Sequence, residues 1–126
     1  MKTSLSIPCK VALFLPMLAV AVLSPLAGAQ SYPSKPIRLI VPFPPGGAVD
    51  AIGRIIGQGL GKSFGHNVVI DNRGGAAGAI GSEIAARAPA DGYTLLVGST
   101  STISINPALN PKLVYNPQRD FVPVSL

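Results

Sequence analysis

The sequence predicts an α/β fold built on a parallel sheet, and three observations support this. Three short apolar runs, at residues 37–41, 67–72 and 93–98, are typical of strands. The segments between them carry apolar residues at intervals of three and four, which is the spacing of amphipathic helices. Each run is followed by a loop rich in glycine or in small hydroxyl residues. The order strand, helix, strand, helix, strand predicts parallel strands joined by right-handed crossovers.

The first strand, loop and helix form the segment around which the rest of the chain is arranged. The run at 37–41 is interrupted only by Arg38, and the proline–glycine loop at 42–47 can only be a sharp turn. The helix is predicted to start near Asp50, which can cap or charge its first turn, and to end at 61–65 with a left-handed glycine. Its shared apolar face consists of Ile52, Ile55, Ile56, Leu60 and Phe64.

The later elements repeat this plan and then become less regular. A second glycine-rich loop, at 73–81, opens a second helix that Pro89 is expected to stop. The apolar face of this helix consists of Ile80, Ile84, Ala85 and Ala88. After the third strand, we expect a short helical turn at 105–109, a proline-punctuated loop at 112–120 and a strand at 121–126. Because the chain stops inside an apolar run, we expect more protein to follow.

The first loop and the helix start behind it are predicted to bind an anion. A helix N-terminus carries free backbone N–H groups and a partial positive charge, and Gly46 and Gly47 leave those groups accessible. All three loops leave the carboxyl ends of strands, which is the edge where parallel sheets bind ligands. The alternative is a tight turn without a ligand, because glycine turns after strands are common.

Residues 1–29 are organised as a secretory signal peptide. Lys2 and Lys10 give a positive start, residues 11–23 are uncharged and mostly apolar, and 27–29 are small residues suited to cleavage before Gln30. The apolar run is too short for a membrane-spanning helix, so export is favoured over a retained anchor. Cys9, the only cysteine, would leave with the signal, so the mature chain, 30–126, is expected to be free of thiols.

The composition of the mature chain argues against several classes of function. Eight basic and five acidic residues are scattered singly, whereas nucleic-acid binding favours a clustered basic stripe. His66 stands alone without cysteines or an acid cluster, so neither a metal set nor a nucleophile–base arrangement is expected. The glycines at 75, 78 and 81 do not have the dinucleotide-binding spacing, and 61–63 closes a helix instead of opening one as a P-loop does.

Several motifs together resemble the Bug family, the extracytoplasmic solute receptors of tripartite tricarboxylate transporters. They cover essentially the whole mature chain and keep their order and spacing. The motifs are residues 42–47 with Asp50 and Arg54, Asn72 and Arg73, Ile80 and Gly81, residues 91–95, residues 105–109 and residues 119–121. The second loop departs from the family pattern, because Gly74 stands where the family usually has proline and Ala77 where it usually has glycine.

The resemblance implies a type II periplasmic-binding-protein-like fold, in which two α/β domains close over a small carboxylate-bearing solute. Residues 30–126 would then be a partial first domain, ending near the crossover to a missing second domain. The resemblance also implies that main-chain groups and bridging water hold the ligand, with hydroxyl donors from the third loop. The expected ligand-binding residues are Phe43, Pro45, Gly46, Gly47, Asp50, Ala76, Ala77, Gly78, Ser99 and Thr100.

The function expected from the resemblance is that of a periplasmic receptor, a monomer that binds a small carboxylate and hands it to transporter membrane subunits. No catalytic residue, cofactor, metal or nucleic-acid partner is expected. For Ser99 and Thr100 the alternative is a polar loop that satisfies its own backbone. For Arg54 a surface ion pair with Asp50 is the favoured interpretation, and Asp50 is also a candidate for ordering the loop. Two other functions stay open, an exported α/β enzyme acting on a small anion and a truncated, inactive fragment.

Overall fold

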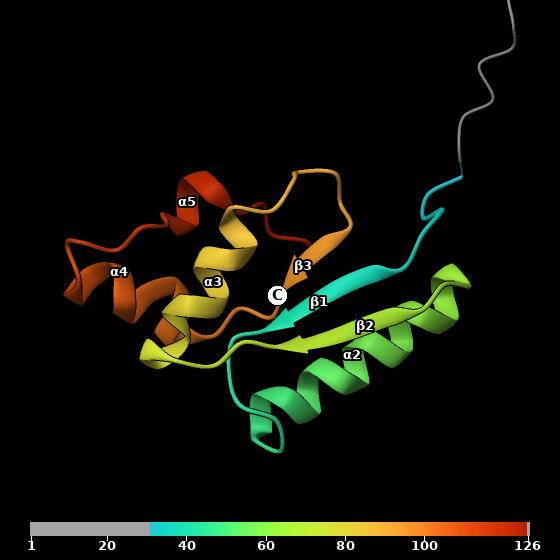
Figure 1. The fold of residues 1–126 in the computed structure, drawn as a ribbon, viewed down its shortest axis with the longest axis horizontal. Coiled ribbons are helices and arrows are strands. Elements are labelled where there is room, and N and C mark those ends of the chain that lie inside the picture. The colour runs from blue at the N-terminus through green and yellow to red at the C-terminus, as the bar shows by residue number, and fades with distance from the viewer. Residues whose placement is uncertain (1–30, 126) are drawn as a thin grey trace, which may run out of the picture. The chain divides into compact units, whose positions relative to one another are not determined.

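The computed structural model describes residues 31–125, in which three strands form one parallel sheet (Figure 1). The proposed signal peptide, 1–29, lies outside the described residues. Within 31–125, no helix is long and apolar enough to cross a membrane. The elements are β1 (Ile37–Val41), α2 (Ala48–Phe64), β2 (Val68–Asn72), η2 (Ala76–Gly78), α3 (Ala79–Ala86), β3 (Thr94–Leu96), η3 (Ser101–Ile105), α4 (Asn106–Leu109) and α5 (Pro117–Asp120).

The sheet has the strand order β2-β1-β3, and both pairings are parallel as the sequence predicts. In the register, Leu39 of β1 lies beside Ile70 of β2 and Leu95 of β3. The central strand is covered on both faces, with α2 along one and α3 over the other (Figure 1). Ile37, Ile40 and Val41 are therefore fully buried, which explains the nearly continuous apolar run in this strand.

The helix α2 begins and ends close to its predicted limits, but its apolar face is not the face that packs on the sheet. Gly53 and Gly57 are buried against β1 and β2, while Ile55 is 70% exposed. A Cβ at Gly53 would lie 2.7 Å from Val41 Cγ2, so the helix backbone lies too close to the sheet for a larger residue there. Small residues thus set the packing, and the isoleucine spacing predicts the helix without predicting its contact face.

The second helix packs in the same way. Gly81 and Ser82 are buried, whereas Ile80, which the sequence places on the apolar face, is 48% exposed. A Cβ at Gly81 would lie 2.8 Å from Pro42 Cα, so α3 presses directly on the exit of β1. The helix ends at Ala86, three residues before Pro89, which was expected to stop it.

The prediction of a strand at 121–126 is wrong for the residues of this segment that the structure describes. Residues 121–125 form no strand, and Val122 and Val124 are more than 80% exposed, so this apolar run is not buried as a strand core would be. A strand needs a hydrogen-bonding neighbour, and within 31–125 β3 pairs only with β1. The helical turn predicted at 105–109 is confirmed by α4, and α5 lies within the predicted loop at 112–120.

Candidate anion site at the strand exits

Three loops meet at the carboxyl edge of the sheet. We call them the first loop (residues 42–47, after β1), the second loop (73–78, after β2) and the third loop (97–102, after β3). The first loop enters α2 on one face of the sheet, and the second enters α3 on the other (Figure 1). Ligands of open parallel sheets bind where the connections diverge in this way, so the edge is the place to look for a site.

Specific contacts hold the three loops together. The amide Nδ2 of Asn72 donates to the carbonyl oxygen of Phe43 at 3.1 Å, which joins the first loop to the end of β2. A Cβ at Gly74 would lie 2.9 Å from Pro44 Cδ, and one at Gly78 would lie 2.6 Å from Thr102 Cγ2 and 3.3 Å from Phe43 Cζ. The second loop therefore passes in close contact with both neighbouring loops, and a larger residue at Gly74 or Gly78 would require its neighbours to shift.

The buried side chain of Asp50 holds the first loop in place. Its side chain is only 5% exposed, and its Oδ2 accepts hydrogen bonds from the Gly46 amide at 2.9 Å and from Arg54 Nε at 3.0 Å. Its Oδ1 accepts from Asn72 Nδ2 at 2.9 Å. The hydrogen bond from Arg54, followed by those from the Gly46 amide and Asn72, lowers the pKa of Asp50 from 3.8 to about 2. The carboxylate is thus ionised and accepts hydrogen bonds from three donors.

The first turn of α2 is left without a side-chain cap. Gly47 is the N-cap residue, in an extended conformation, and offers no side chain to the amides of the first turn. Residues 44–48 are exposed, and Gly46 has a φ of 87°, a conformation that favours glycine. The helix therefore presents backbone N–H groups and the positive end of its dipole to the open edge.

The second loop is held in an unusual backbone conformation. Ala76 and Ala77 have φ values of 46° and 52°, in the left-handed region that alanine rarely adopts, and Gly78 follows with a φ of 88°. The Gly78 amide donates to the carbonyl oxygen of Gly75 at 2.9 Å, which closes the turn. The amide of Ala79, the first residue of α3, donates in turn to the carbonyl oxygen of Ala76, so the turn leads directly into the helix.

The third loop largely satisfies its own polar groups, as the alternative interpretation of its hydroxyl run anticipates. The Ser99 hydroxyl lies 2.9 Å from Ser101 Oγ and 3.3 Å from Thr102 Oγ1, which also accepts from the Ser99 amide. Thr102 is fully buried, and its carbonyl oxygen accepts a 2.6 Å hydrogen bond from Tyr115 Oη. Thr100 is exposed, immediately before η3.

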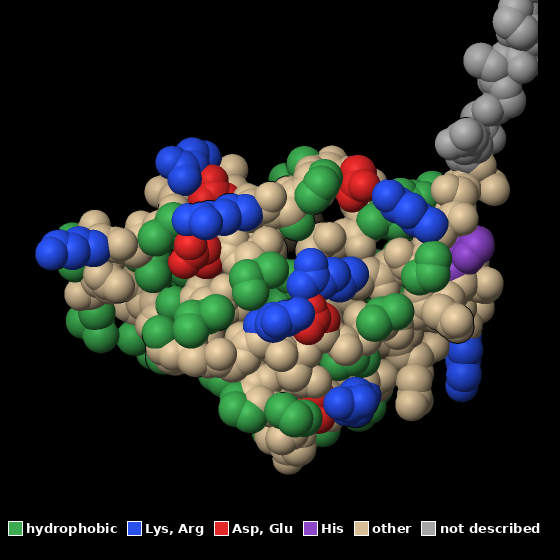
Figure 2. All heavy atoms as spheres, in the orientation of Figure 1, with side chains coloured by type: hydrophobic (Ala, Val, Ile, Leu, Met, Phe, Trp, Pro, Cys, Tyr) green, Lys and Arg blue, Asp and Glu red, His purple; other side chains and the backbone are tan. Residues whose placement is uncertain are grey.

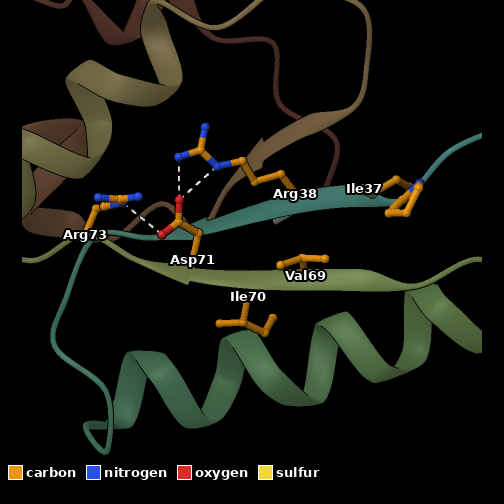
Figure 3. Close-up of a pocket in the computed structure, with 7 residues that line it drawn as sticks. Ile37, Arg38, Val69, Ile70, Asp71 and Arg73 are labelled. Carbon is orange, nitrogen blue, oxygen red and sulfur yellow. Dashed lines mark hydrogen bonds and ion pairs between the residues drawn. The ribbon is translucent and has the colours of Figure 1, made fainter.

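The arginines that adjoin the loops are engaged in ion pairs. Figure 3 shows Arg38 and Arg73 both directed at Asp71, on the face of the sheet away from α2, while Ile70 points toward α2. Burial works against the charge of Asp71, but the hydrogen bonds from the two arginines outweigh it and lower the pKa of this carboxyl. On the face seen in Figure 2, basic side chains in the middle lie beside acidic ones and form no continuous stripe.

Two shallow hollows lie outside the first and third loops, and one of them reaches Arg73 at the start of the second loop. One, of about 470 Å³, surrounds Arg38 and Val69, and the other, of about 640 Å³, lies between α2 and the edge of β2 beside His66. Neither includes the helix amides or the loop glycines at 46–47, so we do not assign the anion site to them. Within residues 31–125, no three His, Cys, Asp or Glu side chains gather closely enough to hold a metal ion.

Comparison with known proteins identifies the family. Residues 52–126 match the family described as the tripartite tricarboxylate transporter family receptor. The chain belongs to this family. A protein from the tcbD-tcbE intergenic region of a Pseudomonas species is 50% identical over 97 residues, and Protein BugT of Bordetella pertussis is 43% identical over 110 residues. These alignments cover 77% and 86% of this chain but 29% and 34% of the relatives, so the chain spans about a third of their length.

Solved structures confirm the periplasmic-binding-protein-like fold. The periplasmic binding protein BugD matches with a TM-score of 0.50 and 42% identity over 52% of this chain and 22% of that chain, and three further structures match over more of this chain. A protein described as a periplasmic transporter matches with a TM-score of 0.74 and 52% identity. An R. palustris protein solved with adipate matches with a TM-score of 0.71 and 38% identity, and MatC from Rhodopseudomonas palustris with bound malate with 0.72 and 39%. The three matches cover 75%, 74% and 75% of this chain and 32%, 31% and 32% of those chains, respectively.

In this member of the receptor family, the residues predicted from the sequence lie at one edge of the sheet, but they differ in burial. Gly78 is buried where the three loops meet, and Asp50 is buried beneath the first loop. Phe43 and Ser99 are half-buried. The remaining predicted residues are exposed along the edge, and they are Pro45, Gly46, Gly47, Ala76, Ala77 and Thr100.

Two polar residues that connect the loops were not among the predicted site residues. Asn72 bonds to both Phe43 and Asp50, and Asn106 Nδ2 donates to the carbonyl oxygen of Ala77 at 3.1 Å. Asn72 is a polar residue at the end of an apolar strand, a position that often serves a loop or a site. Asn106 follows the third loop in the sequence, and no local pattern indicates that it reaches the second loop.

Proposed function

We propose that the chain forms one wall of a periplasmic receptor that binds a small carboxylate and passes it to the membrane subunits of a tripartite tricarboxylate-type transporter. The observation that carries this proposal is the meeting of three loops at one sheet edge, with the uncapped first turn of α2 open to it. Relatives of matching fold solved with adipate and malate support a carboxylate as the ligand.

Backbone amides are the groups proposed to bind the carboxylate. The neighbouring arginines are already paired, Arg54 with Asp50 and Arg73 with Asp71. A carboxylate placed at the N-terminus of α2 accepts N–H hydrogen bonds that are fixed in direction before binding, and it also gains from the helix dipole. The site is proposed to include the exposed residues of the first and second loops, with Ser99 and Thr100 as hydroxyl donors in the third.

We further propose that this receptor is not an enzyme. General acid–base catalysis needs an acid or base within reach of a substrate, with a pKa near the working pH. Asp50 is the acid nearest the first loop, and its carboxylate accepts three donors beneath that loop with a pKa lowered to about 2. It is therefore suited to hold the loop in place, and it would be a poor proton carrier.

Replacing Gly47 with valine is expected to weaken carboxylate binding by about tenfold to a hundredfold, the effect of losing hydrogen bonds to a charged group. The valine side chain would cover the first amides of α2. The fold should tolerate it, because Gly47 has a φ of −86° and a Cβ there would meet only Pro44 O, at 3.8 Å. Calorimetric titration with malate, adipate and a tricarboxylate measures the effect, and a thermal melt checks the fold.

Gly59→Val is the matched control for this variant. Gly59 lies on the exposed side of the same helix with open space around it, so valine there should leave the affinity unchanged. Equal affinity of the Gly47→Val and wild-type chains would contradict the assignment of the first loop. Failure of the wild-type chain to bind any of the carboxylates would contradict the proposed function itself.

A further inference from the structure

The second loop holds two consecutive alanines in a conformation that alanine disfavours. Left-handed backbone brings the alanine Cβ close to the following carbonyl oxygen, so Ala76 and Ala77 both strain the loop. Such residues keep this conformation only where surrounding contacts impose it. The loop must therefore be held by contacts from outside its own sequence.

One such contact is a hydrogen bond from Asn106. Its Nδ2 donates to the carbonyl oxygen of Ala77 at 3.1 Å, across 29 positions of sequence. Asn106 is the first residue of α4, which follows the third loop through η3, so this bond ties the second loop to the segment behind the third. The close approach of Gly78 to Thr102 lies at the next residue of the same turn.

We propose that Asn106 is a positioning residue of the solute site, one that holds the second loop in its left-handed turn so that the exposed backbone of Ala76 and Ala77 is in place before the solute arrives. This inference rests on the proposed function, because the consequence it predicts is a change in the affinity for solute. Preorganised donors cost less conformational entropy on binding than donors that must first be ordered. Loss of the Asn106 bond therefore weakens binding without removing any group that touches the solute.

The test combines Asn106→Ala with Ala77→Gly in the full chain. Hydrogen exchange of the Gly78 amide reports on the loop itself, because this amide closes the turn onto Gly75 whether or not solute is present. Asn106→Ala should speed this exchange and weaken malate and adipate binding, each by about threefold to tenfold, the effect of one hydrogen bond. Adding Ala77→Gly should partly reverse both effects, the faster exchange and the weaker binding, because glycine adopts positive φ without strain.

Asn67→Ala is the matched control, since Asn67 is an exposed asparagine at the opposite end of β2. This variant should leave the exchange of Gly78 and the solute affinity unchanged. The positioning role is overturned if Asn106→Ala leaves the exchange rate of the Gly78 amide unchanged. It is also overturned if Ala77→Gly reverses neither the faster exchange nor the weaker binding. If the wild-type chain binds neither malate nor adipate, the proposed function fails, and the exchange measurement still decides whether Asn106 holds the loop.

Discussion

Gly78→Ala is expected to lower the free energy of unfolding by about 2–5 kcal/mol, the sum of a left-handed strain and an overpacking cost. Gly78 has a φ of 88°, and its Cβ would lie 2.6 Å from Cγ2 of the fully buried Thr102. Phe43 Cζ, at 3.3 Å, and the carbonyl oxygen of Pro42 leave little room for the methyl group to move away. Urea unfolding followed by circular dichroism measures the change.

Gly65→Ala separates the two parts of this effect. Gly65, the C-cap of α2, also has a positive φ, of 68°, but a Cβ there would meet nothing within 4 Å. This variant should therefore lose only the backbone part, about 1–2 kcal/mol. Equal losses in the two variants would show that the three loops do not pack around Gly78 as described.

Asp50→Asn is expected to remove a pH-dependent part of the stability. The pKa of Asp50 is lowered from 3.8 to about 2 in the folded chain, chiefly by Arg54, so folding favours the ionised form. The stability that this carboxylate contributes is fully present above the unfolded pKa, near pH 4, and is lost as the pH falls toward 2. An asparagine cannot ionise, and its NH₂ group cannot accept the bonds that Oδ2 accepts from the Gly46 amide and Arg54.

Thermal melts of the wild-type and Asp50→Asn chains from pH 7 to pH 2 test this expectation. The variant should melt at a lower temperature at neutral pH, and the difference between the two chains should shrink between pH 4 and pH 2. The difference in melting temperature between the two chains leaves out the contributions of Asp71, Asp91 and Asp120, whose pKa values are also lowered. A difference that stays constant across this pH range would contradict the proposed contribution of the ionised Asp50 carboxylate to stability.

Local sequence patterns predict most of the elements because each is specified by its own residues. The run at 37–41 is apolar enough to mark a central strand, and Gly65 supplies the left-handed cap that ends α2. The three loops could also be placed, because parallel strands bring their carboxyl ends to one edge. The conformation of residues 121–125 could not be predicted from local pattern, because a strand depends on a hydrogen-bonding partner that the segment's own sequence does not contain.

The packing faces and the links between loops could not be predicted from local pattern. Periodicity identifies an apolar face, but Gly53 and Gly57 allow so close an approach to the sheet that the glycine face packs instead. Asn72 and Asn106 connect residues 29 positions apart, and such pairings appear only when the fold brings them together. The left-handed conformation of Ala77 is likewise imposed by its surroundings, because alanine does not prefer it.

Titration of the ¹⁵N-labelled wild-type chain with malate, followed by amide NMR, tests most directly whether main-chain amides at the strand exits bind the carboxylate. The proposal predicts that chemical shifts change at residues 46–49 and 76–79, with smaller changes at Ser99 and Thr100. It also predicts that the side-chain signals of Arg38 and Arg73 stay in place, because both arginines remain paired with Asp71. Shifts centred on those arginines, with the amides of 46–49 unchanged, would contradict it.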